Sequence, residues 1–68
     1  MSIARVTEIT ASSNKSFEDA VREGLMRANK TLRNVKGAWI AEQKVTCDDA
    51  GRISDFRVTM KVTFIMDE

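Results

Sequence analysis

The pattern of apolar and polar residues divides the chain into four regular segments. Residues 3–10 are rich in β-branched side chains, and residues 53–66 alternate between apolar and polar positions, so both segments predict β-strands. Between them, residues 17–35 carry apolar side chains at every third or fourth position, which is the spacing of one face of an α-helix. Gly37 is expected to end this helix, and a further strand is predicted over residues 38–47.

The boundaries between these segments carry signals of their own. Ser16 is a favourable N-cap, with acidic residues following it in the first helical turn. The sequence "DDAGR" at 48–52 predicts a hairpin turn in which the glycine adopts a positive φ angle. The order β-α-β-β predicts an α+β fold, in which a three-stranded antiparallel sheet packs on one helix. Residues 1–68 are expected to form a single domain.

The predicted helix is too short to cover the longest strand. Fourteen strand residues extend ~45 Å, whereas 19 helical residues extend only ~28 Å. With one cysteine and no histidine, neither an internal disulfide nor a zinc site of the usual kind can stabilise so small a core. We therefore expect a homo-oligomer, in which a second chain covers the exposed end of the sheet.

Composition narrows the class of function. The net charge of +1 gives no signal for a nucleic-acid partner, and no apolar run approaches the ~20 residues of a membrane span. The absence of an export signal and the unpaired Cys47 predict a cytoplasmic protein, with Cys47 as a small buried apolar residue. Because no nucleophile stands with a base, the chain is not expected to be an enzyme.

Trp39 is the one tryptophan of the chain and the main candidate for a functional surface. Strict alternation along the strand places it on the same face as Ala41, Gln43 and Val45, which is a semi-polar face rather than a core face. Trp39 is therefore not expected to serve a monomer core. Packing at a subunit interface and stacking against a ligand both suit its large apolar ring, and interface packing is favoured by the pattern alone.

Charged side chains give weaker candidates. Glu42, Asp48 and Asp49 flank the predicted hairpin and could gather around a cation in an oligomer, although a solvated surface is the simpler interpretation. At the helix end, Arg33 and Lys36 complement the helix dipole and are also placed to hold a phosphate.

The segments "KSFEDAVREGLMRANKTLRNV" and "FRVTMKVTFIMDE" resemble the dodecin family over nearly the whole chain. The likeness rests on the serine-rich start of the helix, on "KTLRNV" at 30–35 and on "VTMKVTF" at 58–64. The resemblance implies a hollow dodecameric shell of small β-α-β-β subunits. It also implies a small-molecule ligand, because most characterised dodecins resemble flavin-storage proteins that hold riboflavin or FMN near two-fold axes.

The site implied by this resemblance does not match residue by residue. In flavin-binding dodecins a tryptophan early in the second strand stacks on the flavin ring, and a glutamine on the third strand bonds its polar edge. Without a gap after "KTLRNV", the family's tryptophan position falls on Gly37, two residues before Trp39, and its glutamine position falls on Arg57. Trp39 with Gly37, Arg57 and Gln43 is the flavin site that this chain would offer.

A second branch of the family is also similar. The segments "AWIAEQKV" and "DDAGRI" are similar to the calcium dodecins, so calcium is the alternative ligand, with Glu42, Asp48 and Asp49 proposed from their charge alone. We expect a flavin-binding storage protein. The alternative is an oligomeric shell that binds a cation or another phosphorylated ligand, with Trp39 as interface packing.

Overall fold

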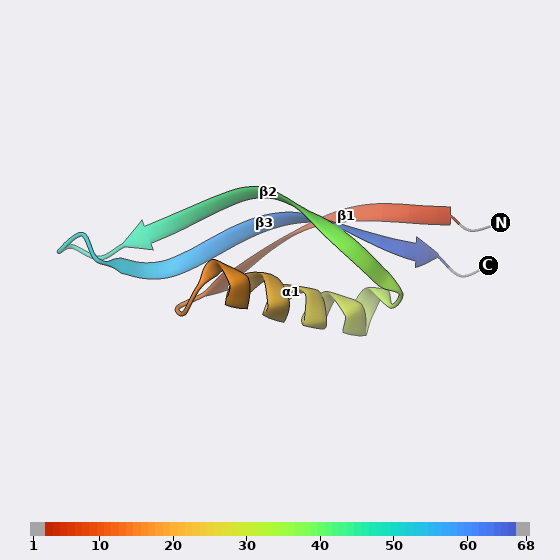
Figure 1. The fold of residues 1–68 in the computed structure, drawn as a ribbon, viewed down its shortest axis with the longest axis horizontal. Coiled ribbons are helices and arrows are strands. Elements are labelled where there is room, and N and C mark those ends of the chain that lie inside the picture. Colours follow the sequence, from red (N-terminus) through yellow and green to blue (C-terminus); the bar gives the residue numbers. More distant parts are fainter. Residues whose placement is uncertain (1–2, 67–68) are drawn as a thin grey trace.

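The computed structural model describes residues 3–66 as one helix lying under one sheet (Figure 1). The elements are β1 (Ile3–Ser13), α1 (Phe17–Leu32), β2 (Val35–Cys47) and β3 (Ile53–Met66). Both β1 and β2 pair with β3 in antiparallel fashion, which gives the strand order β1-β3-β2. The β-α-β-β prediction and the three-stranded antiparallel sheet are confirmed.

Helix α1 covers only the middle of the sheet. Its 16 residues span ~24 Å, whereas the molecule is 53 Å long. In Figure 1 the hairpin between β2 and β3 extends past one end of α1, and the paired ends of β1 and β3 extend past the other. Both ends of the sheet therefore lack cover within one chain, as the lengths of the predicted elements implied.

The helix ends earlier than its apolar spacing predicted. It ends at Leu32, because Arg33 and Asn34 take positive φ angles of 62° and 50° and turn the chain back toward the sheet. Val35 is the first residue of β2. Its side chain packs against the core, as the apolar spacing predicted, but a strand supplies it and not the helix. Gly37 lies inside β2, and the prediction that it ends the helix is wrong.

The start of α1 is fixed by two serines. Ser16 is the N-cap, as predicted, and its hydroxyl accepts a hydrogen bond from the Asp19 amide at 2.9 Å. The hydroxyl of Ser13, the last residue of β1, donates to the Asp19 carboxylate at 2.7 Å and accepts from the Lys15 amide at 2.9 Å. The end of β1 and the first turn of α1 are thus joined by Asp19. Strand β1 continues its pairing with β3 to Ser13, beyond the predicted end at Thr10.

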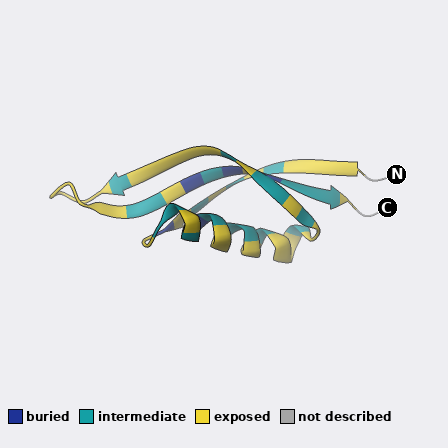
Figure 2. Ribbon diagram, viewed as in Figure 1, coloured by how far each residue is buried: buried dark blue, intermediate teal, exposed yellow. Residues whose placement is uncertain are grey.

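The core lies between the middle of β3 and α1. Val58, Met60 and Val62 are fully buried, and Figure 2 shows this dark stretch of β3 directly above the helix. Because β3 is the central strand, its neighbours shield it on both sides while α1 covers its inner face. The alternation predicted for this strand is confirmed. The side chains packed around this cluster are Ile9, Ala11, Phe17, Val21, Leu25, Leu32, Val35, Ala38 and Ile40.

Small residues let the helix approach the sheet closely. Ala20 is the one fully buried residue of α1, and Gly24 follows it one turn later on the same face. A Cβ atom at Gly24 would lie 2.9 Å from the Ala11 Cβ and 2.9 Å from the Met60 Cε. Both distances are well below normal carbon–carbon contact, so the absence of a side chain at Gly24 sets the spacing between α1 and the sheet.

Replacing Gly24 with alanine is expected to lower the melting temperature, although alanine favours a helix by about 1 kcal/mol over glycine. The Met60 Cε can shift, but the Ala11 Cβ is fixed to the backbone of β1, and such overpacking typically costs ~1–3 kcal/mol. Thermal unfolding followed by circular dichroism measures the effect. Gly37→Ala is the control, because no atom within residues 3–66 lies within 4 Å of a Cβ there. A Gly24→Ala protein that melts no lower than this control would contradict the packing argument.

Candidate functional site

Strand β2 contains a bulge directly after Trp39 and Ile40. Ile40 pairs with Met60 of β3, but the next paired residue of β2 is Glu42, which lies opposite Thr59. Ala41 is therefore an extra residue without a partner on β3. Side chains that follow the bulge are moved to the opposite face from the one that strict alternation predicts.

The bulge separates Trp39 from Gln43. Gln43 pairs with the buried Val58 and so belongs to the face that α1 covers, whereas Trp39 and Glu42 lie on the opposite face. The prediction that Trp39 and Gln43 share a face is wrong. Strict alternation could not reveal this, because Ala41 has no side-chain feature that marks a bulge in the sequence.

Trp39 lies on the sheet face opposite α1, which we call the helix-free face. Around Trp39 this face is formed by Val6, Glu8, Thr10, Gly37, Trp39, Glu42, Thr59, Lys61 and Thr63. The Trp39 side chain is 75% exposed and takes no part in the core. Gly37, two residues earlier on the same face, has no atom of the described residues within 4 Å of its missing Cβ position. The flat apolar ring of Trp39 therefore lies beside an uncovered surface at Gly37, as expected of a subunit interface or a ligand-binding site.

Two charged residues lie in the same row of the sheet as Trp39, one on each of the other two strands. Lys61 of β3 lies directly opposite Trp39, and Glu8 of β1 lies opposite Lys61 on its other side. Neither residue stands out in the sequence as a candidate site residue. Alternation along β3 identifies Lys61 as facing away from the core, but only the pairing register places it next to Trp39.

Arg57 shares the helix-free face but does not adjoin Trp39. It lies four residues along β3 from Lys61, which corresponds to ~13 Å. Its guanidinium is 3.5 Å from the Asp55 carboxylate, in an ion pair that is partly open to solvent. Within one chain, Arg57 and Trp39 therefore do not form a single pocket.

The acidic candidates Glu42, Asp48 and Asp49 do not form a cation site within the described part of one chain. The Asp48 carboxylate accepts hydrogen bonds from the amides of Ala50 and Arg52 at 2.9 and 3.0 Å, and it pairs with the Arg52 side chain at 3.3 Å. These bonds close the predicted turn, in which Gly51 has the expected positive φ of 80°. Within residues 3–66, no three acidic or cysteine side chains come together as a metal site. A cation site formed with Glu42 or Asp49 of other copies stays a prediction.

Cys47 is exposed at the end of β2, so the prediction that it is buried is wrong. The residue pairs with Ile53 at the hairpin, beyond the part of the sheet that α1 covers. Burial there requires a cover that one chain does not supply.

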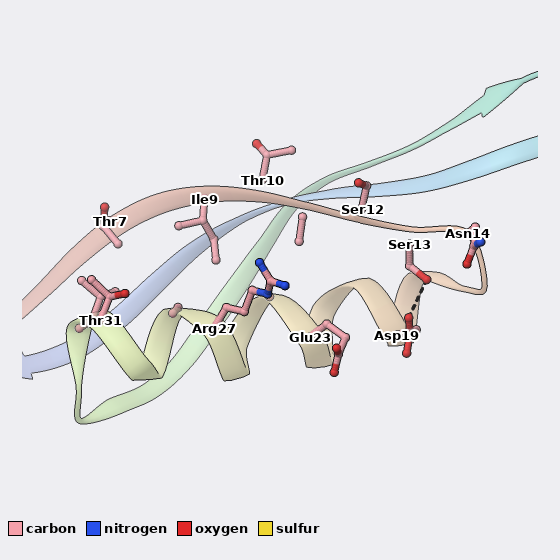
Figure 3. Close-up of a pocket in the computed structure, with 14 residues that line it drawn as sticks. Thr7, Ile9, Thr10, Ser12, Ser13, Asn14, Asp19, Glu23, Arg27 and Thr31 are labelled. Atoms are coloured by element: carbon pink, nitrogen blue, oxygen red, sulfur yellow. Dashed lines mark hydrogen bonds between the residues drawn. The ribbon is translucent and has the colours of Figure 1, made fainter.

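A concave surface lies between the β1 edge and α1 (Figure 3). This groove encloses about 770 Å³ and combines hydroxyl groups of β1 with charged side chains of α1, among them Glu23 and Arg27. In Figure 3 the Arg27 side chain reaches from the helix toward β1, and the Ser13–Asp19 hydrogen bond closes one end. The groove is on the helix side of the sheet, and Trp39 does not line it.

The chain is thus a small β-α-β-β protein with an exposed tryptophan on the helix-free face of its sheet. The family model for dodecins matches residues 3–67. The chain is 33% identical to the calcium dodecin of Mycobacterium tuberculosis over 66 residues, which cover 97% of this chain and 92% of that protein. The chain belongs to the dodecin family.

Solved dodecin structures share the fold over nearly the full chain. The dodecin from Streptomyces davaonensis superposes with a TM-score of 0.92 at 37% identity, covering 98% of this chain and 97% of that one. The M. tuberculosis calcium dodecin, described as having a novel calcium-binding site, gives a TM-score of 0.82 at 31% identity, with coverages of 96% and 91%. Dodecins are small binding and storage proteins.

No helix within residues 3–66 is long and apolar enough to cross a bilayer.

Proposed function

We propose that this dodecin stores riboflavin or FMN between the subunits of a homododecameric shell and does not act on the flavin chemically. The observation that carries this proposal is the exposure of Trp39, at 75%, on the helix-free face of the sheet. Stacking against another flat apolar surface buries the exposed indole ring and is favourable in free energy. A flavin ring provides such a surface.

The space around Trp39 accommodates a ring wider than indole. Gly37 lies ~7 Å from Trp39 along β2, on the same face, and leaves the surface open. A flavin ring stacked on Trp39 therefore has room to extend over Gly37. Stacking contributes about 0.5–1.5 kcal/mol in addition to the burial of apolar area.

The separation of Trp39 and Arg57 favours a site shared between copies. The two residues are ~13 Å apart along one sheet, so a single ring on Trp39 does not meet Arg57 of the same chain. A second copy that faces the first across the ligand would bring its own Arg57 to the ring or to the phosphate of FMN. Because the helix-free face and both ends of the sheet lack cover in one chain, such an assembly also buries surface that the monomer leaves open.

A fluorescence titration tests the proposal. Purified, ligand-stripped protein, shown by light scattering to be assembled, is added to riboflavin and separately to FMN. We expect flavin emission to be quenched and to saturate at a fixed ratio of flavin to subunits, with the Trp39 emission quenched in parallel. Unquenched flavin in the presence of assembled protein contradicts flavin storage.

Calcium is the second candidate ligand, and the similarity to the M. tuberculosis calcium dodecin favours it. Asp48 is already bonded within its turn, so Glu42 and Asp49 remain as the candidate carboxylates, and a site would need ligands from several copies. In this case Trp39 is interface packing. Calorimetric heat from calcium, together with no response to flavin, would favour this alternative.

A further inference from the structure

Lys61 of β3 is the residue that pairs with Trp39 on the helix-free face. It is exposed, and its strand register places it directly across from Trp39, at the distance where side chains of neighbouring strands meet. Glu8 lies opposite Lys61 on β1, yet no ion pair joins them within residues 3–66. Among the residues that the structure describes, no ion pair or side-chain hydrogen bond engages the Lys61 ammonium, and Lys61 lies beside Trp39 in the sheet.

The other cations of this face are placed differently. Arg57 is engaged with Asp55, and Lys44 lies opposite Arg57 in the same row of the sheet. That row is ~13 Å from the row of Trp39 and Lys61. Among the described residues, Lys61 is thus the one cation of the helix-free face that lies in the row of Trp39.

A planar ligand on Trp39 must overhang the indole. On one side of β2 lies the open edge of the sheet, and on the other side lies β3, with Lys61 about 4.8 Å away across the strand pair. The part of a wide ring that extends toward β3 therefore passes over or beside the Lys61 side chain. An ammonium group has three donors and no acceptor, so it selects for a ring edge that accepts hydrogen bonds or carries negative charge.

Resting on the proposed stacking at Trp39, we propose that Lys61 recognises the polar edge of the stacked ligand. The ligand class is a flat heteroaromatic ring with carbonyl oxygens or an electron-rich ring nitrogen on one edge, as in the pyrimidine part of a flavin. Lys61 replaces, from within the same chain, the edge contact that Arg57 is too distant to make. Its positive charge also favours the reduced, anionic form of a bound flavin and so raises the flavin reduction potential.

Calorimetric titration of riboflavin and FMN into the assembled protein tests this role. Lys61→Met removes the charge and keeps an unbranched side chain, and Lys44→Met removes the same charge from the same face two rows away. We expect Lys61→Met to weaken riboflavin binding at least about tenfold, because hydrogen bonds to a charged group are the stronger ones. Lys44→Met is expected to stay within about twofold of the unaltered protein, and Lys61→Gln, which keeps a neutral donor, to fall between the two.

The possible outcomes separate the two proposals. No binding of riboflavin by the unaltered assembly overturns flavin storage and the role of Lys61 with it. Binding by the unaltered protein, with equal affinities for Lys61→Met and Lys44→Met, overturns the role of Lys61 alone. A loss confined to FMN assigns Lys61 to the phosphate and overturns ring-edge recognition.

A redox measurement and an assembly measurement complete the test. The midpoint potential of bound riboflavin is expected to be lower in Lys61→Met than in Lys44→Met, and an unchanged potential overturns the contact with the ring. If both Lys61→Met and Lys61→Gln lose the assembled mass, Lys61 is a structural residue and the proposal fails.

Discussion

Replacing Met60 with alanine is expected to lower the free energy of unfolding by about 2–5 kcal/mol, the range for truncating a buried methionine. Met60 is fully buried at the centre of a core that has only three other fully buried residues among those described. A domain of this size has a total stability of roughly 3–10 kcal/mol at typical values per residue. The substitution therefore removes a large share of the stability, and the variant is expected to be partly unfolded near physiological temperature.

Met26→Ala provides the matched control, because Met26 lies on α1 with 56% of its side chain exposed. The two variants lose the same atoms and differ in burial. Urea unfolding at equal protein concentration measures both, since association couples stability to concentration. The core assignment is wrong if Met60→Ala is no less stable than Met26→Ala.

Replacing Trp39 with alanine is expected to weaken riboflavin binding by at least tenfold and to leave the fold intact. The fold is unaffected because the side chain is 75% exposed and lies on the helix-free face. The affinity falls because the ligand loses both stacking and buried apolar area, and 1.4 kcal/mol corresponds to a factor of ten. Equilibrium dialysis is the appropriate measurement, because quenching of fluorescence depends on the tryptophan itself.

Two further variants make this result specific. Trp39→Phe keeps a smaller aromatic face and is expected to bind with intermediate affinity. Ile53→Ala removes an exposed apolar side chain at the hairpin and is expected to bind riboflavin normally. Unchanged affinity in Trp39→Ala would remove this residue from the flavin site. A lower assembled mass or melting temperature in the same variant would instead show that Trp39 packs between subunits.

Local signals predicted most of the fold. The apolar spacing of the helix, the alternation along the third strand, the Ser16 cap and the glycine of the turn each act over a few residues. The last three are confirmed, and the helix is confirmed from Phe17 to Leu32 but not to Val35. The resemblance to dodecins was also confirmed. These features depend on the backbone preferences of neighbouring residues, so one sequence is enough to recognise them.

Pairing between strands decided what the local signals could not. The Asn34 carbonyl accepts a hydrogen bond from the Ile65 amide of β3, and this tertiary contact accompanies the turn that ends the helix before Val35. The apolar spacing continues to Val35 because this residue also packs against the core, although it belongs to β2 and not to the helix. Periodicity reports which face is buried, but it does not report which element supplies each residue.

The composition of the candidate site was decided in the same way. The amino-acid pattern was sufficient to predict the β-α-β-β order, the core strand and the exclusion of Trp39 from the monomer core. Only the tertiary structure placed Lys61 beside Trp39, moved Gln43 to the opposite face and separated Arg57 from the indole. The physical reason is that the bulge at Ala41 and the register of β2 on β3 arise from contacts between distant residues, and a one-residue shift exchanges the two faces of a strand.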